Sequence, residues 1–309
     1  SSSTKYPLGY MFGNDKYDGG VFVKQYTSTD YVTSGGTYNA KCGSDYGYYI
    51  PSNLTQVNIT NAEYIQSGAL SYVYSMSSSS SAVHSPLNIT SITLNEGIKY
   101  IGKYAFGSVN IYRDSAYLNN SYYQYYYSGL ETVNLPSTLL EISDGAFYNC
   151  QFLDGVDIPG SVTSIGDYAF YNCKSMNNIL LPKTLTSLGT SAFEGCKSFT
   201  EIYIPGNVSS IGNRAFCDCQ NVESIVADEG VKSIGINAFK NINKVTNLEM
   251  PTTVTYFGEG VFSGMSSLES LTIPFVGSSK TEITSSSTKY PLGYMFGNDK
   301  YDGGVFVKQ

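Results

Sequence analysis

The chain has 309 residues, a formal net charge of −7 and an isoelectric point of about 4.8. Charged residues make up only 14% of it, so it lacks the basic face that binding to nucleic acid or docking on an anionic membrane requires. It contains no run of about 18 apolar residues, so we expect no membrane-spanning segment. It shows no signal-peptide pattern and does not begin with methionine, so we expect a processed or excised piece.

Residues 1–53 are rich in tyrosine, glycine and serine. Turn-forming residues mixed with β-prone aromatic residues predict a hairpin or an ordered loop rather than a helix. The first 25 residues recur without a change as residues 285–309. Two interpretations stay open. Either the excised piece overlaps its own starting point, or the parent protein is a tandem array of near-identical 284-residue units.

From residue 130 to residue 265 one pattern recurs every 23 residues. Apolar residues precede a proline by six, three and one positions, as Leu153, Val156 and Ile158 precede Pro159. Two more apolar positions, a glycine and an Ala-Phe dipeptide follow it. A fixed period in the twenties is the signature of a solenoid, in which each coil packs only on its neighbours. The dipeptide occurs as Ala146-Phe147, Ala169-Phe170, Ala192-Phe193, Ala215-Phe216 and Ala238-Phe239, and as Val261-Phe262.

Two less regular coils precede these, and extra residues follow each of them. We expect a serine-rich insertion at 75–85 and a tyrosine-rich insertion at 110–127. The predicted organisation is therefore a partial coil with a Tyr/Gly-rich insertion at 1–53, a solenoid at 54–277, and the start of the next unit at 278–309.

Each coil should contain one short strand, because the residues three and one before the proline alternate with outward ones. The proline lacks a backbone donor and ends that strand. We expect a parallel strand ladder on one face, turns or short strands on the other, and little helix. The phenylalanines of successive coils should stack. A glycine follows the apolar residue six positions after the proline, as Gly166 follows Ile165, and it is predicted to need a positive φ.

The repeat resembles the BspA-like class of bacterial leucine-rich repeats, whose copies follow L-x-x-V-x-I-P-x-x-V-x-x-I-G-x-x-A-F-x-x-C. The resemblance covers Leu54 to Ile273. It implies a β-rich leucine-rich-repeat solenoid of 23-residue coils in a secreted or surface-attached bacterial protein. It also implies adhesion, with a host protein, a glycan or another cell as the partner.

Four cysteines occupy a slot that holds apolar residues in other coils, so we expect them in the core as small hydrophobic residues. Cys217 lies outside that slot and is predicted to be exposed, and a bond between Cys42 and Cys217 stays open. A single Cys-x-Cys pair does not supply a zinc site, so we expect no metal and no cofactor. The four core cysteines are Cys150, Cys173, Cys196 and Cys219.

The sequence offers no pattern typical of an active site. His84 is the only histidine, and no nucleophile-elbow motif accompanies it. Acidic residues such as Glu131, Asp154, Glu223 and Glu269 fall at outward strand positions, which is typical of a solvated surface. We expect no catalytic residues and no enzymatic activity.

Tyrosine is the clearest functional signal, because it combines with Ser, Gly and Asn as in binding surfaces. The alternative, that these tyrosines pack on the coil edges, stays open. The outward row two residues before the proline is a second candidate surface, as the exposed sheets of solenoids often are. That row reads Asn134, Asp157, Leu180, Tyr203, Val226 and Glu249. The candidate ligand-binding residues are Tyr46, Tyr48, Tyr49, Tyr117, Tyr122, Tyr123, Tyr125, Tyr126, Tyr127, Asp157 and Tyr203.

Two hypotheses follow, and they can coexist. In the first, the chain is a non-enzymatic cell-surface or secreted protein that mediates adhesion by binding a protein or glycan on a host or neighbouring cell. In the second, it is a structural unit of a long tandem-array fibre or surface layer, with adjacent copies meeting end to end. The second is motivated by the identical residues 1–25 and 285–309 and by the open ends of the solenoid. Residues 292–296 resemble residues 165–170 with one residue missing and should complete the coil that opens at Leu271. We expect no nucleic-acid partner and no direct membrane insertion.

Overall fold

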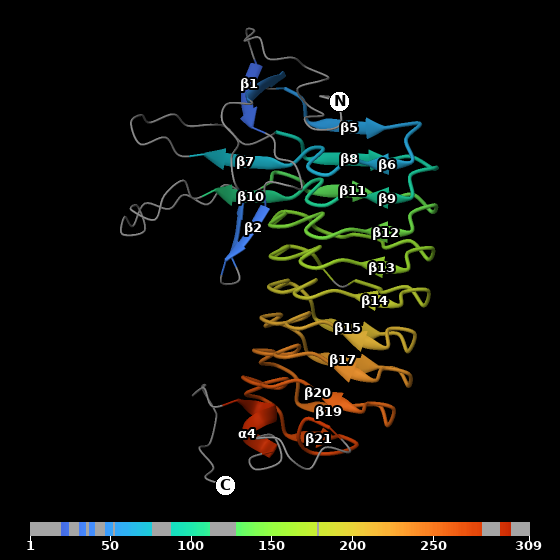
Figure 1. Ribbon diagram of the computed structural model, residues 1–309, viewed down its shortest axis with the longest axis vertical. Coiled ribbons are helices and arrows are strands. Elements are labelled where there is room, and N and C mark those ends of the chain that lie inside the picture. The colour runs from blue at the N-terminus through green and yellow to red at the C-terminus, as the bar shows by residue number, and fades with distance from the viewer. Residues whose placement is uncertain are drawn as a thin grey trace, which may run out of the picture.

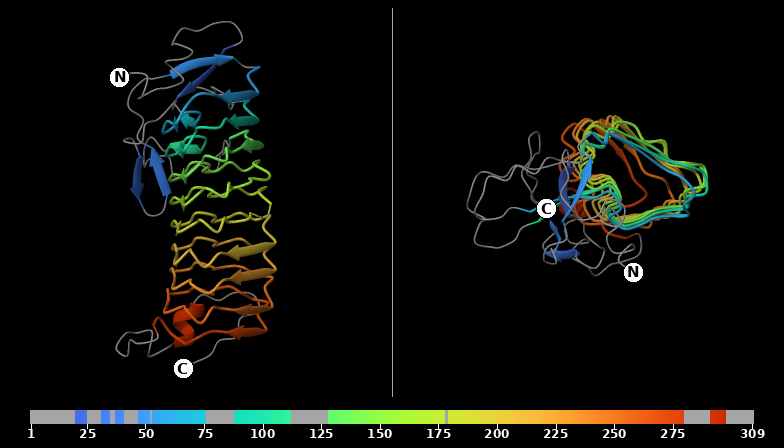
Figure 2. Two further views of the ribbon diagram at one scale, coloured as in Figure 1. Left: turned by 90° about the vertical axis from the view of Figure 1, so that its right-hand side faces the viewer. Right: turned by 90° about the horizontal axis from the view of Figure 1, so that it is seen from above.

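The computed structural model describes residues 20–24, 31–34, 37–40, 47–51, 53–75, 88–111, 128–177, 179–279 and 291–297. Their coils stack into an elongated solenoid (Figure 1), and successive coils superimpose in the view along its long axis (Figure 2). The regular structure of these residues is almost all β-strand, and their one helix is α4 (Pro291–Phe296). The predicted β-rich solenoid with little helix is confirmed.

The most continuous sheet among the described residues forms the back wall, to which each coil contributes only two residues. Its eight strands pair in parallel, so that Ile165 lies opposite Ile142 on one side and Leu188 on the other. The second residue of each pair is buried, and the first is half-buried or exposed. The strands are β6 (Tyr64–Ile65), β9 (Tyr100–Ile101), β12 (Glu141–Ile142), β13 (Ser164–Ile165), β14 (Ser187–Leu188), β16 (Ser210–Ile211), β18 (Ser233–Ile234) and β20 (Tyr256–Phe257).

The strands before the proline form the opposite side, called here the strand face, and their ladder is interrupted. Parallel pairing joins β5, β8 and β11, then β15 with β17, and then β19 with β21. The two coils between β11 and β15 keep their buried residues, such as Leu153 and Val156, without forming a strand. The strands are β5 (Gln56–Ile59), β8 (Ser91–Leu94), β11 (Thr132–Asn134), β15 (Glu201–Ile204), β17 (Ser224–Ala227), β19 (Asn247–Glu249) and β21 (Ser270–Thr272).

A four-stranded sheet, called here the insertion sheet, lies at the N-terminal end of the solenoid. β7 (Tyr72–Ser75) and β10 (Ser108–Ile111) pair in parallel, while β1 (Gly20–Lys24) pairs antiparallel with both β7 and β4 (Gly47–Pro51). A separate antiparallel hairpin consists of β2 (Tyr31–Ser34) and β3 (Thr37–Ala40), which confirms the hairpin expected in this part of the chain. Both predicted insertions begin in this sheet, and most of their residues lie outside the described part.

The Ala-Phe dipeptides form the centre of the core. Phe147, Phe170, Phe193 and Phe216 are fully buried, and their ring centroids lie 5.0, 5.3 and 5.5 Å apart in near-parallel stacks. The predicted phenylalanine stack is confirmed. Burying one such ring contributes about 2–3 kcal/mol. Since each ring is covered by the rings of the adjacent coils, the coils stabilise one another and none is stable alone.

The glycine that follows the back wall has a different role from the predicted one. The prediction of a positive φ is wrong, because none of these glycines is among the residues with positive φ. A Cβ atom on Gly212 would instead lie 2.4 Å from the backbone carbon of Gly189 in the preceding coil. Main-chain atoms cannot rotate away from such a contact, so glycine is needed for the close approach of coils. This glycine column comprises Gly166, Gly189, Gly212, Gly235 and Gly258.

The left-handed backbone occurs at two other positions in the coil. The first lies directly before the alanine, as at Arg214 with a φ of 55°, and the second directly before the cysteine slot, as at Asp218 with a φ of 61°. Asn, Asp or Gly fills the second position, because these residues tolerate a positive φ. The residues with positive φ at that position are Asn149, Asn172, Gly195, Asp218, Asn241 and Gly264.

Candidate functional site

The strand face carries a row of outward side chains two residues before the proline. Tyr203 of β15 lies opposite Val226 of β17, and Leu180 occupies the same position one coil earlier. Leu180 is 74% exposed and Val226 is 49% exposed, while Tyr203 is half-buried. These three residues form an apolar strip across successive coils. Scattered single apolar side chains are normal on a surface, but contiguous ones point to an interaction site.

Tyr203 is held in place within this strip. Its hydroxyl donates a hydrogen bond to Oδ2 of Asp228, which stands where the neighbouring coils have proline. This bond to a carboxylate raises the pKa of Tyr203, and partial burial acts in the same direction. Because the ring is already fixed between two coils, it has little side-chain entropy left to lose when a partner binds.

Carboxylates surround the apolar strip. Asp157 and Glu249 extend its row at the two ends, and Glu201 and Glu223 are exposed beside it. No Lys or Arg occupies the positions two, four or five residues before the proline in any coil. Lys244 lies beside this face, with its Nζ 3.8 Å from Glu223. The outward row of the strand face therefore has apolar side chains at its centre and carboxylates beside them.

The structure places two of the predicted ligand-binding residues, Asp157 and Tyr203, in this one row, two coils apart. Tyr48 and Tyr49 belong to β4, where they lie opposite Val23 and Phe22 of β1 in the insertion sheet. The remaining candidates lie outside the described residues and stay predictions: Tyr46, Tyr117, Tyr122, Tyr123, Tyr125, Tyr126 and Tyr127. His84 also lies outside the described part.

Leu180 and Val226 belong to the outward row expected from the sequence but were not among the candidate ligand-binding residues. The signal that would have found them is an apolar residue at a position that is polar in most other coils. Their outward direction follows from the strand period, and the structure adds the degree of exposure.

The four regularly spaced cysteines are core residues, as predicted. Cys150, Cys173, Cys196 and Cys219 are fully buried, and each thiol donates to the carbonyl oxygen of a phenylalanine in the preceding coil at 3.2–3.4 Å. Burial raises the pKa of Cys150 to about 12. Since the thiolate is the nucleophilic and metal-binding form, these thiols are chemically inert in the folded chain.

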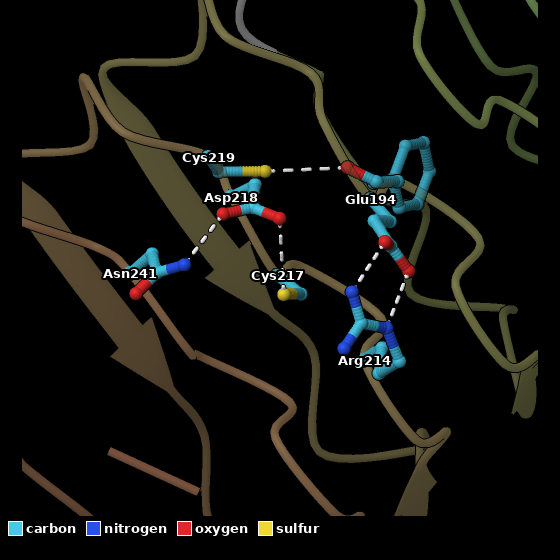
Figure 3. A network of polar contacts seen from close by, with 7 residues as sticks. Glu194, Arg214, Cys217, Asp218, Cys219 and Asn241 are labelled. Atoms are coloured by element: carbon cyan, nitrogen blue, oxygen red, sulfur yellow. Dashed lines mark hydrogen bonds and ion pairs between the residues drawn. The ribbon is translucent and has the colours of Figure 1, made fainter. Parts of the chain in front are cut away.

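The prediction that Cys217 is exposed is wrong, because its side chain is fully buried beside a polar network (Figure 3). Arg214 donates two hydrogen bonds to Glu194, at 2.9 and 2.6 Å. The Cys217 thiol donates to Asp218 at 3.5 Å, and Asn241 donates to the other oxygen of that carboxylate at 2.7 Å. Cys42 lies outside the described residues, so the proposed Cys42–Cys217 bond stays untested.

Glu194, Cys217 and Asp218 could in principle hold a metal ion, since their potential ligand atoms lie within 4.8 Å of one another. However, both oxygens of Glu194 already accept bonds from Arg214, and the same bond raises the pKa of that guanidinium. Burial also raises the pKa of Cys217, which opposes formation of the thiolate that a metal requires. We interpret the network as a structural link between three coils.

These features define a solenoid repeat protein with an exposed strand face suited to binding. The sequence matches the family described as BspA type Leucine rich repeat region in six copies, over residues 77–198, 118–219 and 186–290. The chain belongs to this family of leucine-rich repeat proteins. Within the described residues, no helix has the length and apolarity needed to cross a membrane.

The chain is also similar to solved structures. A leucine-rich repeat protein of T. pallidum is 18% identical with a TM-score of 0.42, over 77% of this chain and 87% of that one. A leucine-rich cell surface protein of Faecalibacterium prausnitzii is 21% identical with a TM-score of 0.38, over 81% and 76%. A leucine-rich repeat protein of Bacteroides ovatus is 17% identical with a TM-score of 0.37, over 84% and 88%. The comparison with curated proteins gives no match.

Proposed function

We propose that the chain is a non-enzymatic binding module of a cell-surface or secreted bacterial protein, which mediates adhesion by holding a partner protein on its strand face. The apolar strip of Leu180, Tyr203 and Val226, exposed within a frame of carboxylates, is the observation that carries this proposal. Membership in a family of bacterial repeat proteins supports it. The partner that fits is a protein on a host or neighbouring cell, with an apolar side chain surrounded by Lys or Arg.

Each part of the strand face has a separate role in this recognition. The apolar strip supplies affinity, since each Å² of apolar surface removed from water contributes about 25 cal/mol. The flanking carboxylates, including Asp157 and Glu249, attract the cationic rim of the partner and speed its association. Because the carboxylates are exposed, salt should slow association strongly while it changes dissociation little.

The proposal is tested by measuring binding of the chain to a panel of immobilised extracellular proteins and glycans. The double substitution Leu180→Ser with Val226→Ser should weaken binding to any recognised panel member at least tenfold. Ile236→Ser is the matched control, because Ile236 is 41% exposed but follows the back-wall strand β18. Binding that survives the double substitution, or is lost equally in the control, contradicts the strand face as the site.

The tyrosine-rich insertion remains the competing location for this activity. Replacing the tyrosines at 122, 123 and 125–127 with serine tests it in the same assay. Loss of binding in this variant, with full binding in the strand-face variant, would move the site from the solenoid to the insertion.

A second function, a structural unit of a long tandem array, is favoured by one observation. Residues 291–296 complete the coil that begins at β21, and their sequence is that of residues 7–12. The sequence of the parent gene tests this function. Several consecutive 284-residue units are expected, and a single unit would contradict it.

A further inference from the structure

The last complete coil of the solenoid contains Gly260 and Phe262 and is called here the last coil. It carries a docking surface, which α4 fills. The backbone amide of Gly260 donates to the carbonyl oxygen of Tyr294 at 2.7 Å, and that of Phe262 donates to Met295 at 3.0 Å. Met295 is fully buried, and the Phe296 ring lies 6.0 Å from the Phe262 ring. Figure 1 shows α4 beside the last coils, at the end of the solenoid opposite the insertion sheet. The surface therefore offers two backbone donors and apolar contacts that bury Met295.

The same two hydrogen bonds join complete coils. Tyr168 donates to the carbonyl oxygen of Thr190, and Phe170 donates to that of Ala192, both at 2.8 Å. Met295 thus takes the position of the alanine, which confirms the predicted alignment of residues 292–296 with a coil that lacks one residue. Docking at this surface continues the solenoid, because the docked segment supplies the second half of the coil that begins at β21.

The chain contains two copies of the docking sequence and one last coil. Residues 7–13 read Pro-Leu-Gly-Tyr-Met-Phe-Gly, as do residues 291–297, and the identity extends over all of 1–25 and 285–309. Whatever affinity the last coil has for one copy, it has for the other, because the contacting groups are the same. Which copy fills the surface then depends on how close each copy is held to it and on the other contacts that each copy makes.

We propose that the last coil of one chain accepts residues 7–13 of a second copy of this chain in exchange for its own residues 291–297, so that copies assemble head to tail. The inference rests on the proposed function as a unit of an array and specifies the contact between units.

The docking segment is tied to its own solenoid, since β1 begins at Gly20 and pairs with β4 and β7. The linker from Gly13 to Gly20 spans at most about 25 Å when fully extended. The two solenoids must therefore meet end to end.

The balance between the two arrangements follows from effective concentration. A segment joined to the last coil by a short linker competes at an effective concentration in the millimolar range. The unchanged chain should therefore be mainly monomeric, with its own α4 in place. Weakening α4 alone should release the surface for a second copy.

The test uses the full chain and matched substitutions in the two copies of the segment. Met295→Asp puts a charge at a buried position and should give oligomers that grow with protein concentration in size-exclusion chromatography with light scattering. Met11→Asp makes the equivalent change in the first copy and should leave the chain monomeric. The double variant should return to the monomer, because neither copy can dock. A monomeric Met295→Asp chain, or a double variant that associates as strongly as Met295→Asp, would overturn the exchange.

A second test uses substitutions that disturb the fold less than a buried charge does, in case the Met295→Asp chain does not fold. Phe296→Ala combined with Phe12→Ala weakens both copies, and a labelled peptide of residues 1–25 should then bind this chain in fluorescence anisotropy. The same peptide carrying Met11→Asp should not bind. Equal anisotropy for both peptides, or no binding by either, would also overturn the exchange. The number of units in the parent gene is a separate result, so the array and the exchange can fail independently.

Discussion

The back wall and the strand face are built from the same 23-residue repeat, yet they are constrained very differently. The back wall is one ladder of eight parallel strands, and beside it the glycine column brings the main chains of adjacent coils into contact. The strand face has three separate ladders, and its outward row ranges from Asp157 to Leu180. The tight main-chain contacts on one side allow little variation, whereas outward side chains can change without disturbing the stack. Recognition is therefore expected where the scaffold constrains the sequence least.

The largest expected effect comes from the core that both sides share. Phe193→Ala should lower the free energy of unfolding by about 3–5 kcal/mol, because it leaves a cavity between two stacked rings. Phe152→Ala is the matched control, since Phe152 is 54% exposed and its loss should change stability by less than about 0.5 kcal/mol. Urea unfolding followed by circular dichroism measures both. Similar losses for the two variants would show that the stacked rings do not hold the coils together.

The glycine column should be the next most sensitive feature. Gly212→Ala should cost about 1–3 kcal/mol, because the added methyl group meets the backbone of Gly189 at 2.4 Å and the coils must move apart. Gly160→Ala has nothing within 4 Å of the added group, so its unfolding free energy should be unchanged or slightly higher. Thermal unfolding of the two variants compares them. Equal stability of Gly212→Ala and the unchanged chain would mean that the back wall accepts substitutions as readily as the strand face does.

The thiols of the described cysteines should be protected from thiol reagents in the folded chain, because they are buried. In a Cys42→Ser background, Ellman's reagent should not react with the native chain at pH 8 and should react fully after unfolding in urea. Folding raises the pKa of Cys150 from 9.0 to about 12, so only the unfolded chain releases this proton just above pH 9. Stability from this group is therefore present below pH 9 and falls as the pH rises toward 12. Rapid labelling of the native chain at pH 8 would show that the coils open locally.

The smallest effect on stability is expected on the strand face. Leu180→Ser and Val226→Ser should each change the unfolding free energy by less than about 0.5 kcal/mol, because both side chains are exposed. Urea unfolding of the variants used for the binding assay provides this measurement. A loss above 1 kcal/mol would indicate that the apolar strip packs as part of the scaffold, and it would weaken the case for a recognition surface.

Much of the scaffold could be predicted because residues at the same position of successive repeats pack against one another. The period placed Phe193 on Phe216, placed Cys196 in an apolar slot and directed Asp157 outward, and the structure agrees. The role of Gly212 could not be predicted, because a glycine in every coil suits either a left-handed backbone or a close contact. The burial of Cys217 was missed because it depends on Arg214 and Glu194, which lie in two different coils. The second left-handed position had a sequence signal in the aligned coils, the Asn, Asn, Gly and Asp at 149, 172, 195 and 218.

The candidate site was predictable in part. Strand alternation identified the outward row that contains Tyr203, and the structure added its bond to Asp228. The exposure of Leu180 depends on how neighbouring coils are spaced and on which side chains lie beside it. These quantities are not set by the residue types in one coil.

Four features were predictable from the sequence: the repeat, the stacking of the phenylalanines, the apolar slot of the cysteines and the duplicated segment. These follow from period and residue type, which act identically in every coil. Two features became known only from the folded structure: the back wall is the continuous ladder, and the glycine column sets the coil spacing. These depend on distances between main chains of different coils, which emerge when the whole stack is packed.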